Sequence, residues 1–231
     1  MKKIVYILIM VLVVGTVKAQ TEISAGADLV SSYVWRGTYC AGTSIQPALG
    51  LSRGNFSIGA WGSVDAASQG LKEVDLSASY AFGAFTVGIT DYWWSGEGAF
   101  DYFHFKKDTS SHLLEANLSY TRKSGLSLAW NTLFAGTQDK DEEGDRVFST
   151  YVEAGYAFEV NGVGLVAALG FSPWKPNYLY ATTTDKFAVT NVSLTASKTI
   201  EITEKFSLPV FSQLVFNPAK EDVFLVFGVS F

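Results

Sequence analysis

The chain of 231 residues contains one cysteine, five prolines and two histidines. A single Cys40 cannot form an internal disulfide, which excludes a disulfide scaffold, and we interpret it as a loop residue without a special role. The net charge is −5 and the basic residues are scattered, which excludes a nucleic-acid partner. Cysteine pairs, metal-ligand clusters and phosphate-binding loops are also missing, so the sequence predicts neither a metal nor another cofactor.

Long apolar runs are missing from the body of the chain, where no segment approaches the roughly 20 residues of a membrane-spanning helix. The N-terminus is different. A basic "MKK" precedes the apolar run "IVYILIMVLVVG", and Val17 and Ala19 fit the small-residue positions before a cleavage site. This pattern predicts a secretory signal peptide over residues 1–19 and a mature domain over 20–231; a single anchoring helix is the alternative.

The mature part alternates between apolar and polar residues with a period of two. In "FSIGAWGSV", Phe56 and Ile58 share one face while Ser57, Gly59 and Trp61 share the other. Such alternation is the signal of a strand, because a helix needs a period of 3.6 residues. It predicts twelve strands, over 21–36, 43–53, 56–66, 71–82, 85–95, 112–122, 126–136, 147–160, 163–173, 187–200, 206–217 and 223–231.

The connections between these strands alternate between short and long. Short ones such as "NG" (161–162) and "GA" (83–84) are typical of tight hairpins. Long ones such as "GTQDKDEEGDR" and "WKPNYLYATTTDK" fall on the opposite side. Short periplasmic turns and long extracellular loops are typical of outer-membrane barrels, in which every backbone polar group is paired. We therefore expect a closed antiparallel transmembrane β-barrel of about twelve strands, surrounded by lipid of a Gram-negative outer membrane.

The same alternation assigns small and polar residues to the lumen. Acids outnumber bases six to one among the inward charges, which favours cations over anions. Trp61 points inward as well and would narrow the path. The alternative is that these charges form a closed network around Arg36 that fills the interior. The residues that we expect to form the constriction or its support are Asp28, Arg36, Trp61, Asp65, Glu73, Asp75, Glu115 and Glu153. Asp91 breaks the pattern by falling on the lipid face, where it marks either a bulge or the edge of the membrane band.

An enzyme would need a set of reactive side chains in a recognisable pattern, and the sequence contains few candidates for one. His104 and His112 are the two histidines, and some twelve-stranded barrels are lipid hydrolases. No G-x-S-x-G or comparable signature accompanies them, so we predict that the chain is not an enzyme. The hydrolase stays an alternative that requires a histidine within hydrogen-bond reach of a serine.

Short motifs near the start resemble the TorF-like porin family, whose conserved region is also described as a Gcw-type domain. The resemblance rests on Ser31, Tyr33, Arg36 and Gly37 in "ADLVSSYVWRG", and on the Gly-x-Trp-x-Ser pattern of Gly59 to Ser63. It covers the first third of the chain in motifs and the rest only in architecture. It implies an outer-membrane barrel with porin activity and supplies no substrate.

The last strand, "VFLVFGVSF", ends on Phe231. It resembles the signal that the outer-membrane assembly machinery reads in barrel proteins, and it must pair with the first strand to close the barrel. We expect Phe231 to act in assembly. The sequence as a whole predicts a porin-like channel for passive diffusion of small hydrophilic solutes, with a preference for cations. A non-conducting structural or adhesion barrel, acting through its extracellular loops, is the alternative.

Overall fold

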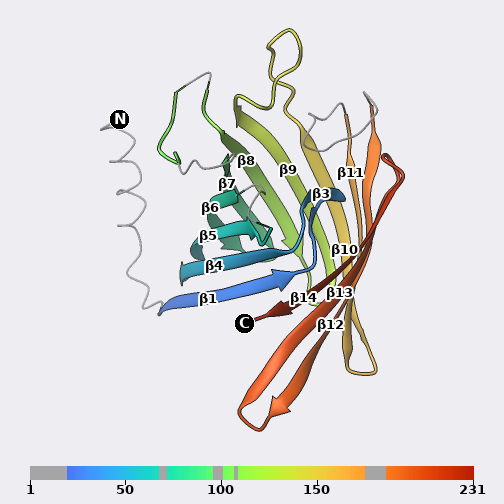
Figure 1. Ribbon diagram of the computed structural model, residues 1–231. Coiled ribbons are helices and arrows are strands. Elements are labelled where there is room, and N and C mark those ends of the chain that lie inside the picture. Colours follow the sequence, from blue (N-terminus) through green and yellow to red (C-terminus); the bar gives the residue numbers. More distant parts are fainter. Residues whose placement is uncertain (1–19, 68–71, 96–100, 107–108, 175–185) are drawn as a thin grey trace.

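A computed structural model describes residues 20–67, 72–95, 101–106, 109–174 and 186–231 (Figure 1). The predicted signal peptide, and most of the aromatic "WKPNYLY" loop, lie outside the described residues. Within the described part, no helix is long and apolar enough to cross a membrane.

Twelve antiparallel strands close into one barrel, which confirms the predicted fold class (Figure 1). Each strand pairs with its neighbours in the barrel, and β14 pairs with β1 to complete the circle. The barrel strands are β1 (Thr21–Val30), β4 (Ser44–Arg53), β5 (Phe56–Asp65), β6 (Lys72–Phe82), β7 (Phe85–Ser95), β8 (His112–Thr121), β9 (Leu126–Gly136), β10 (Thr150–Val160), β11 (Val163–Ser172), β12 (Ala188–Thr203), β13 (Phe206–Asn217) and β14 (Asp222–Ser230). The remaining two strands, β2 (Tyr33–Trp35) and β3 (Thr38–Ala41), form a separate hairpin.

The closing seam joins the two ends of the barrel domain. Asp28 lies opposite Ser230, and Ala27 and Phe231 exchange backbone hydrogen bonds of 3.2 and 3.0 Å. The predicted pairing of the last strand with the first is therefore confirmed. Inside the seam, the Phe211 ring lies so close to Gly228 that a Cβ atom there would be 2.2 Å from it.

The two faces of the barrel wall differ as the alternation predicts. Large apolar side chains on the outside are exposed; Leu49 is 62% and Leu194 45% accessible. Aromatic rings gather on the outer face near the short turns, where Phe85 stands between Phe82 and Tyr120 with centroids 5.8 and 4.9 Å away. Buried inward positions include Gln46, Ser63, Glu73, Glu115 and Asn191. The wall is therefore apolar outside and mostly polar inside.

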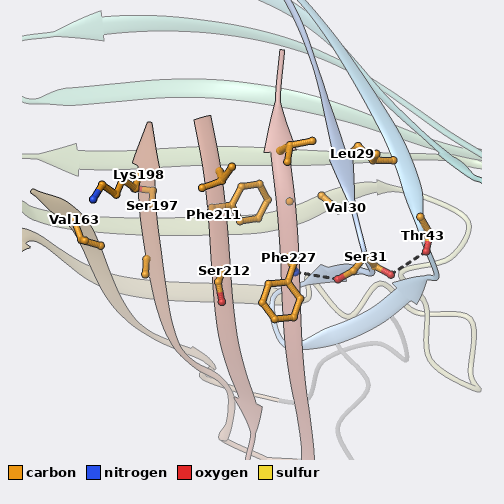
Figure 2. Close-up of a pocket in the computed structure, with 14 residues that line it drawn as sticks. Leu29, Val30, Ser31, Thr43, Val163, Ser197, Lys198, Phe211, Ser212 and Phe227 are labelled. Carbon is orange, nitrogen blue, oxygen red and sulfur yellow. Dashed lines mark hydrogen bonds between the residues drawn. The ribbon is translucent and has the colours of Figure 1, made fainter. Parts of the chain in front are cut away.

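The outer face also carries a groove of about 620 Å³ at the seam (Figure 2). Leu29 and Phe227 line it from outward positions, with Ala196 and Lys198 on β12. The Ser31 hydroxyl closes its end by accepting a 2.9 Å hydrogen bond from the Phe227 backbone N–H (Figure 2). Since the groove lies outside the barrel and is lined mainly by apolar groups, it is no part of a polar path.

Three predicted strand boundaries differ from the observed ones by three or more residues. The first strand ends at Val30 rather than residue 36, because the chain bends at Ser31 and its aromatic residues continue into the inner hairpin. The eighth starts at Thr150 rather than 147, since Phe148 has a φ of 53° that no strand accommodates. The tenth runs to Thr203, where the expected five-residue turn is reduced to Glu204 and Lys205. Cys40, expected in a loop, lies in β3.

Candidate functional site

The first long connection folds into the barrel as a hairpin, made of β2 and β3, that we call the luminal hairpin (Tyr33–Ala41). Trp35 pairs with Thr38, so its turn consists of only Arg36 and Gly37. Both turn residues have positive φ, 51° and 81°. This is the backbone of a type I′ turn, whose twist matches that of the two flanking strands. Arg36 therefore lies at the tip of a hairpin and not on the first barrel strand, which corrects its predicted location.

Aromatic contacts attach the luminal hairpin to three parts of the wall. Tyr33 contacts Trp61 of β5, with ring centroids 5.4 Å apart. Trp35 meets Tyr92 of β7 edge-on at 5.5 Å. On the opposite side Tyr39 stacks against Phe224 of β14 at 6.2 Å. Ring pairs of this kind contribute about 0.5–1.5 kcal/mol each beyond their burial.

The tip of the hairpin is bound by a buried ion pair. The Arg36 guanidinium donates to both oxygens of Glu115 on β8, at 2.6 and 2.9 Å. The two side chains are 11% and 0% exposed. The guanidinium also lies between the rings of Trp35 and Tyr151, 4.4 and 4.7 Å from their centroids. Bidentate geometry and two ring faces together fix the position of this charge.

Glu115 has further donors. The Tyr92 hydroxyl and the Asn117 amide each donate to its Oε2 at 2.8 Å. Its carboxylate thus accepts four hydrogen bonds, which offsets much of the cost of burying a charge. The pair joins the first long connection to a strand 79 residues further along the chain.

Gly37 brings the hairpin against the far wall. The Asn217 side chain of β13 donates a 2.9 Å hydrogen bond to the Gly37 carbonyl. A Cβ atom on Gly37 would lie 1.7 Å from the Thr190 carbonyl oxygen of β12, so only glycine fits. The luminal hairpin therefore contacts β5, β7, β8, β10, β12, β13 and β14, and through the hydrogen bond between Tyr33 and Glu73 also β6. It crosses the lumen near the rim that carries the long loops.

The other acids that sequence reasoning selected do not form one ring. Glu73 is 4% exposed, and the hydrogen-bond partners of its carboxyl group are the side chains of Trp94, Tyr33 and Asp75. Asp75 follows two residues later on the same face of β6. Glu153 accepts a hydrogen bond from the Tyr151 hydroxyl and a 3.1 Å one from the Asn191 amide.

Asp65 and Asp28 lie apart from these contacts. Asp65 accepts backbone hydrogen bonds from Gly42 at 3.3 Å and Ala67 at 2.7 Å, which makes it a support of the rim. Asp28 lies on β1 between Gln46 and Ser230. The structure thus brings together Arg36 and Glu115, with Trp61, Glu73 and Asp75 on the neighbouring wall, and leaves Asp28 and Asp65 outside the group.

Sequence reasoning missed several residues that hold the hairpin, notably Tyr92, Asn117, Tyr151, Asn191 and Asn217. All of them occupy inward positions of predicted strands, so the alternation marks them as lumen residues. The alternation does not distinguish these polar and aromatic residues from the other inward ones. Their role depends on a hairpin that comes from another part of the chain.

Asp91 lies on the outer face, at the edge of the barrel near the long loops. His112 Nδ1 lies 2.9 Å from its carboxylate, and the Tyr102 hydroxyl donates to it at 3.0 Å. Burial and the nearby carboxylate raise the pKa of Tyr102, which keeps this donor protonated. The ring of Phe105 stacks on His112 at 4.4 Å. The loop residues thus shield a polar pair that would otherwise face outward.

Neither histidine meets the requirement of the hydrolase alternative within the described residues. The second nitrogen of His112 lies 2.6 Å from the Tyr102 carbonyl oxygen. His104 lies 2.7 Å from the hydroxyl of Thr109 and 3.3 Å from Asp101, on an exposed loop. No serine hydroxyl lies within hydrogen-bond distance of either imidazole among the residues that the structure describes.

Comparisons with known proteins add few constraints. No family model matches the chain, and no curated protein matches it. A solved KdgM porin aligns over 92% of this chain and 98% of its own length, with 9% identity and a TM-score of 0.48. OprD of Pseudomonas aeruginosa aligns over 94% and 67%, with 11% identity and a TM-score of 0.40. BamA from Haemophilus ducreyi aligns over 87% and 42%, with 11% identity and a TM-score of 0.38.

The fold class rests on the strand pairing of this chain itself. The resemblance to the TorF-like porin family stays a prediction.

Proposed function

We propose that the chain forms an outer-membrane porin-like channel for passive diffusion of small hydrophilic solutes. The observation that carries this proposal is a luminal hairpin held by polar and aromatic contacts across a polar lumen, inside a closed barrel whose outer face is apolar. Exposed leucines, isoleucines and valines around a closed sheet suit hydrocarbon, and the aromatic side chains at the short turns suit a membrane interface.

The hairpin would set the size of the path. Solutes would pass between it and the wall, in contact with hydroxyl, amide and carboxylate groups, and selectivity would follow from bore and wall charge. Arg36 is paired with Glu115, while Glu73, Asp75 and Glu153 place further acidic side chains on the wall. This balance supports the proposed preference for cations.

Recording from purified protein in planar bilayers tests the proposal. We expect discrete openings and, under a salt gradient, a reversal potential of the sign that cation flow produces. An anion-selective reversal potential would contradict the proposed preference, whereas a membrane without discrete openings would contradict the channel.

A second candidate is a non-conducting barrel that acts through its loops. The extent of the hairpin's contacts favours it, because a hairpin that docks on eight strands could close the lumen as well as narrow it. The same recording decides between the two, since a closed barrel gives no openings. Export through a cleaved signal peptide, recognition of Phe231 by the assembly machinery and membership of the TorF-like family remain parts of the proposal.

A further inference from the structure

A cavity of about 450 Å³ lies between the luminal hairpin and the wall formed by β5, β6 and β7. Four aromatic side chains surround it: Tyr33 and Trp35 from the hairpin, Trp61 from β5 and Tyr92 from β7. Ala48 and Gly59 leave the space open, because larger inward residues at these positions would fill it. The hairpin therefore creates an aromatic chamber that the barrel alone does not have.

Asp75 is the only carboxylate among the described residues that line this chamber, and Ser77 and Thr90 supply hydroxyl groups below it. The register places Asp75 directly between Trp61 and Tyr92, on adjacent strands. A carboxyl group thus stands between two aromatic side chains that face the same space.

The carboxylates at this wall have acceptor atoms to spare. Asp75 Oδ1 and Glu73 Oε2 are buried and have no hydrogen-bond partner among the described residues. A buried acceptor without a donor costs about 1–3 kcal/mol, and more when it is charged. A bound group with several N–H donors would remove that cost.

The geometry points to a binding site for an organic cation, a primary ammonium or a guanidinium group, in the chamber between Asp75 and the rings of Tyr33, Trp35, Trp61 and Tyr92. The carboxylate would pair with the cation's charge, and the ring faces would attract it through their quadrupoles. Metal ions such as Ca²⁺ suit the chamber less well, because they require six or more oxygen ligands and the walls are mainly aromatic. The inference deepens the proposed function, on which it rests for its biological setting: it names the class of solute that the channel would hold on its way through.

Equilibrium binding to the full chain, purified in detergent, tests the site without reference to conductance. The probes are n-butylammonium and methylguanidinium chloride, with n-butanol and sodium butyrate as neutral and anionic counterparts, followed by tryptophan fluorescence because Trp35 and Trp61 line the chamber. We expect saturable binding of both cations, and at least tenfold weaker binding of the other two. Equal binding of butanol, or no saturable binding of either cation, would overturn the inference.

Variants assign the binding to the chamber. Asp75→Asn keeps the shape of the side chain, removes its charge and should weaken cation binding at least tenfold. Asp28→Asn is the matched control, since this inward carboxylate lies outside the chamber and its loss should change binding less than twofold. If Asp75→Asn does not fold, as judged by its migration in unheated gels, Trp61→Leu removes a ring instead and should weaken binding severalfold. Unchanged binding in the folded variant would contradict the site.

The outcomes separate this inference from the channel. If the barrel binds butylammonium but gives no openings in bilayers, the binding site is supported and the proposed channel function is contradicted. If the barrel conducts but does not bind the cations, the proposed channel function is supported and the binding site is contradicted.

Discussion

Replacement of Glu115 by glutamine tests whether the ion pair at the hairpin tip holds the luminal hairpin in place. The substitution preserves the volume of a side chain that is 0% exposed, and it removes the charge that accepts both N–H groups of Arg36. Removal of one partner of a buried pair costs about 3–5 kcal/mol, because the other charge is left without compensation. We expect the lower end of this range, since the Arg36 side chain retains 11% exposure to the lumen.

A loss of about 3 kcal/mol corresponds to a shift of roughly a hundredfold in the equilibrium between docked and undocked hairpin, at 1.4 kcal/mol for each factor of ten. The remaining contacts of the hairpin include three ring pairs of about 0.5–1.5 kcal/mol each, the hydrogen bond from Asn217 and the one between Tyr33 and Glu73. The free energy lost with the ion pair is thus comparable with the free energy that all of these contacts contribute together. Its loss should make undocking frequent enough to detect.

Single-channel recording is the assay. Glu115→Gln should show transitions to a state of higher conductance that the unaltered protein rarely visits. Glu159→Gln makes the same chemical change at an exposed position beside a short turn, and it should behave as the unaltered protein does. Addition of Arg36→Gln to Glu115→Gln should reverse part of the effect, because it removes the buried charge that Glu115→Gln leaves without compensation. Identical traces for Glu115→Gln and Glu159→Gln would refute the reasoning.

Five other changes probe the hairpin, the two faces of the wall and the seam. Gly37→Ala should undock the hairpin and lower the thermal stability of the folded barrel; equal unfolding temperatures for this variant and the unaltered chain would contradict the close approach of Gly37 to Thr190. Asn217→Ala loses one buried hydrogen bond and should lower the free energy of unfolding by about 1–3 kcal/mol. Leu194→Arg on the outer face should lower the free energy of unfolding in lipid by about 2–4 kcal/mol. Thr195→Arg on the inner face should fold normally and alter ion selectivity. If urea unfolds Thr195→Arg more readily than Leu194→Arg, the assigned faces are wrong. Deletion of Phe231 should reduce the amount of folded barrel in the membrane without changing single-channel conductance, and normal insertion would count against a role in assembly.

The alternation of the sequence predicts the barrel well because it has a direct physical cause. Lipid on one side and lumen on the other select apolar and polar residues in turn along each strand, so strand number, faces and closing seam follow from it. The alternation of short and long connections also predicts that the long loops gather at one rim of the barrel and the short turns at the other. The boundaries that failed, at Val30, Thr150 and Thr203, depend on a bend, on a residue with positive φ and on a hairpin that extends beyond its neighbours. None of these interrupts the period of two.

The site was less predictable than the fold. Tyr33 and Trp35 continue the alternation of the first strand, and so the sequence gives no sign that they leave the wall and enter the lumen. Arg36 was selected because an inward base among acids needs a partner, but its partner Glu115 lies 79 residues away. Alternation specifies which face a residue occupies and not which distant residue it meets. The chamber around Asp75 exists only once the hairpin is docked, and no local pattern records it.

The central claim is that the luminal hairpin narrows a conducting path. The most direct measurement is the single-channel conductance of the unaltered protein beside a variant in which residues 32–42 are replaced by a short glycine-serine turn. We predict discrete openings in both, with a conductance several times larger in the variant, because the barrel then keeps its wall and loses its constriction. An unaltered protein without discrete openings, or two proteins of equal conductance, would contradict the claim.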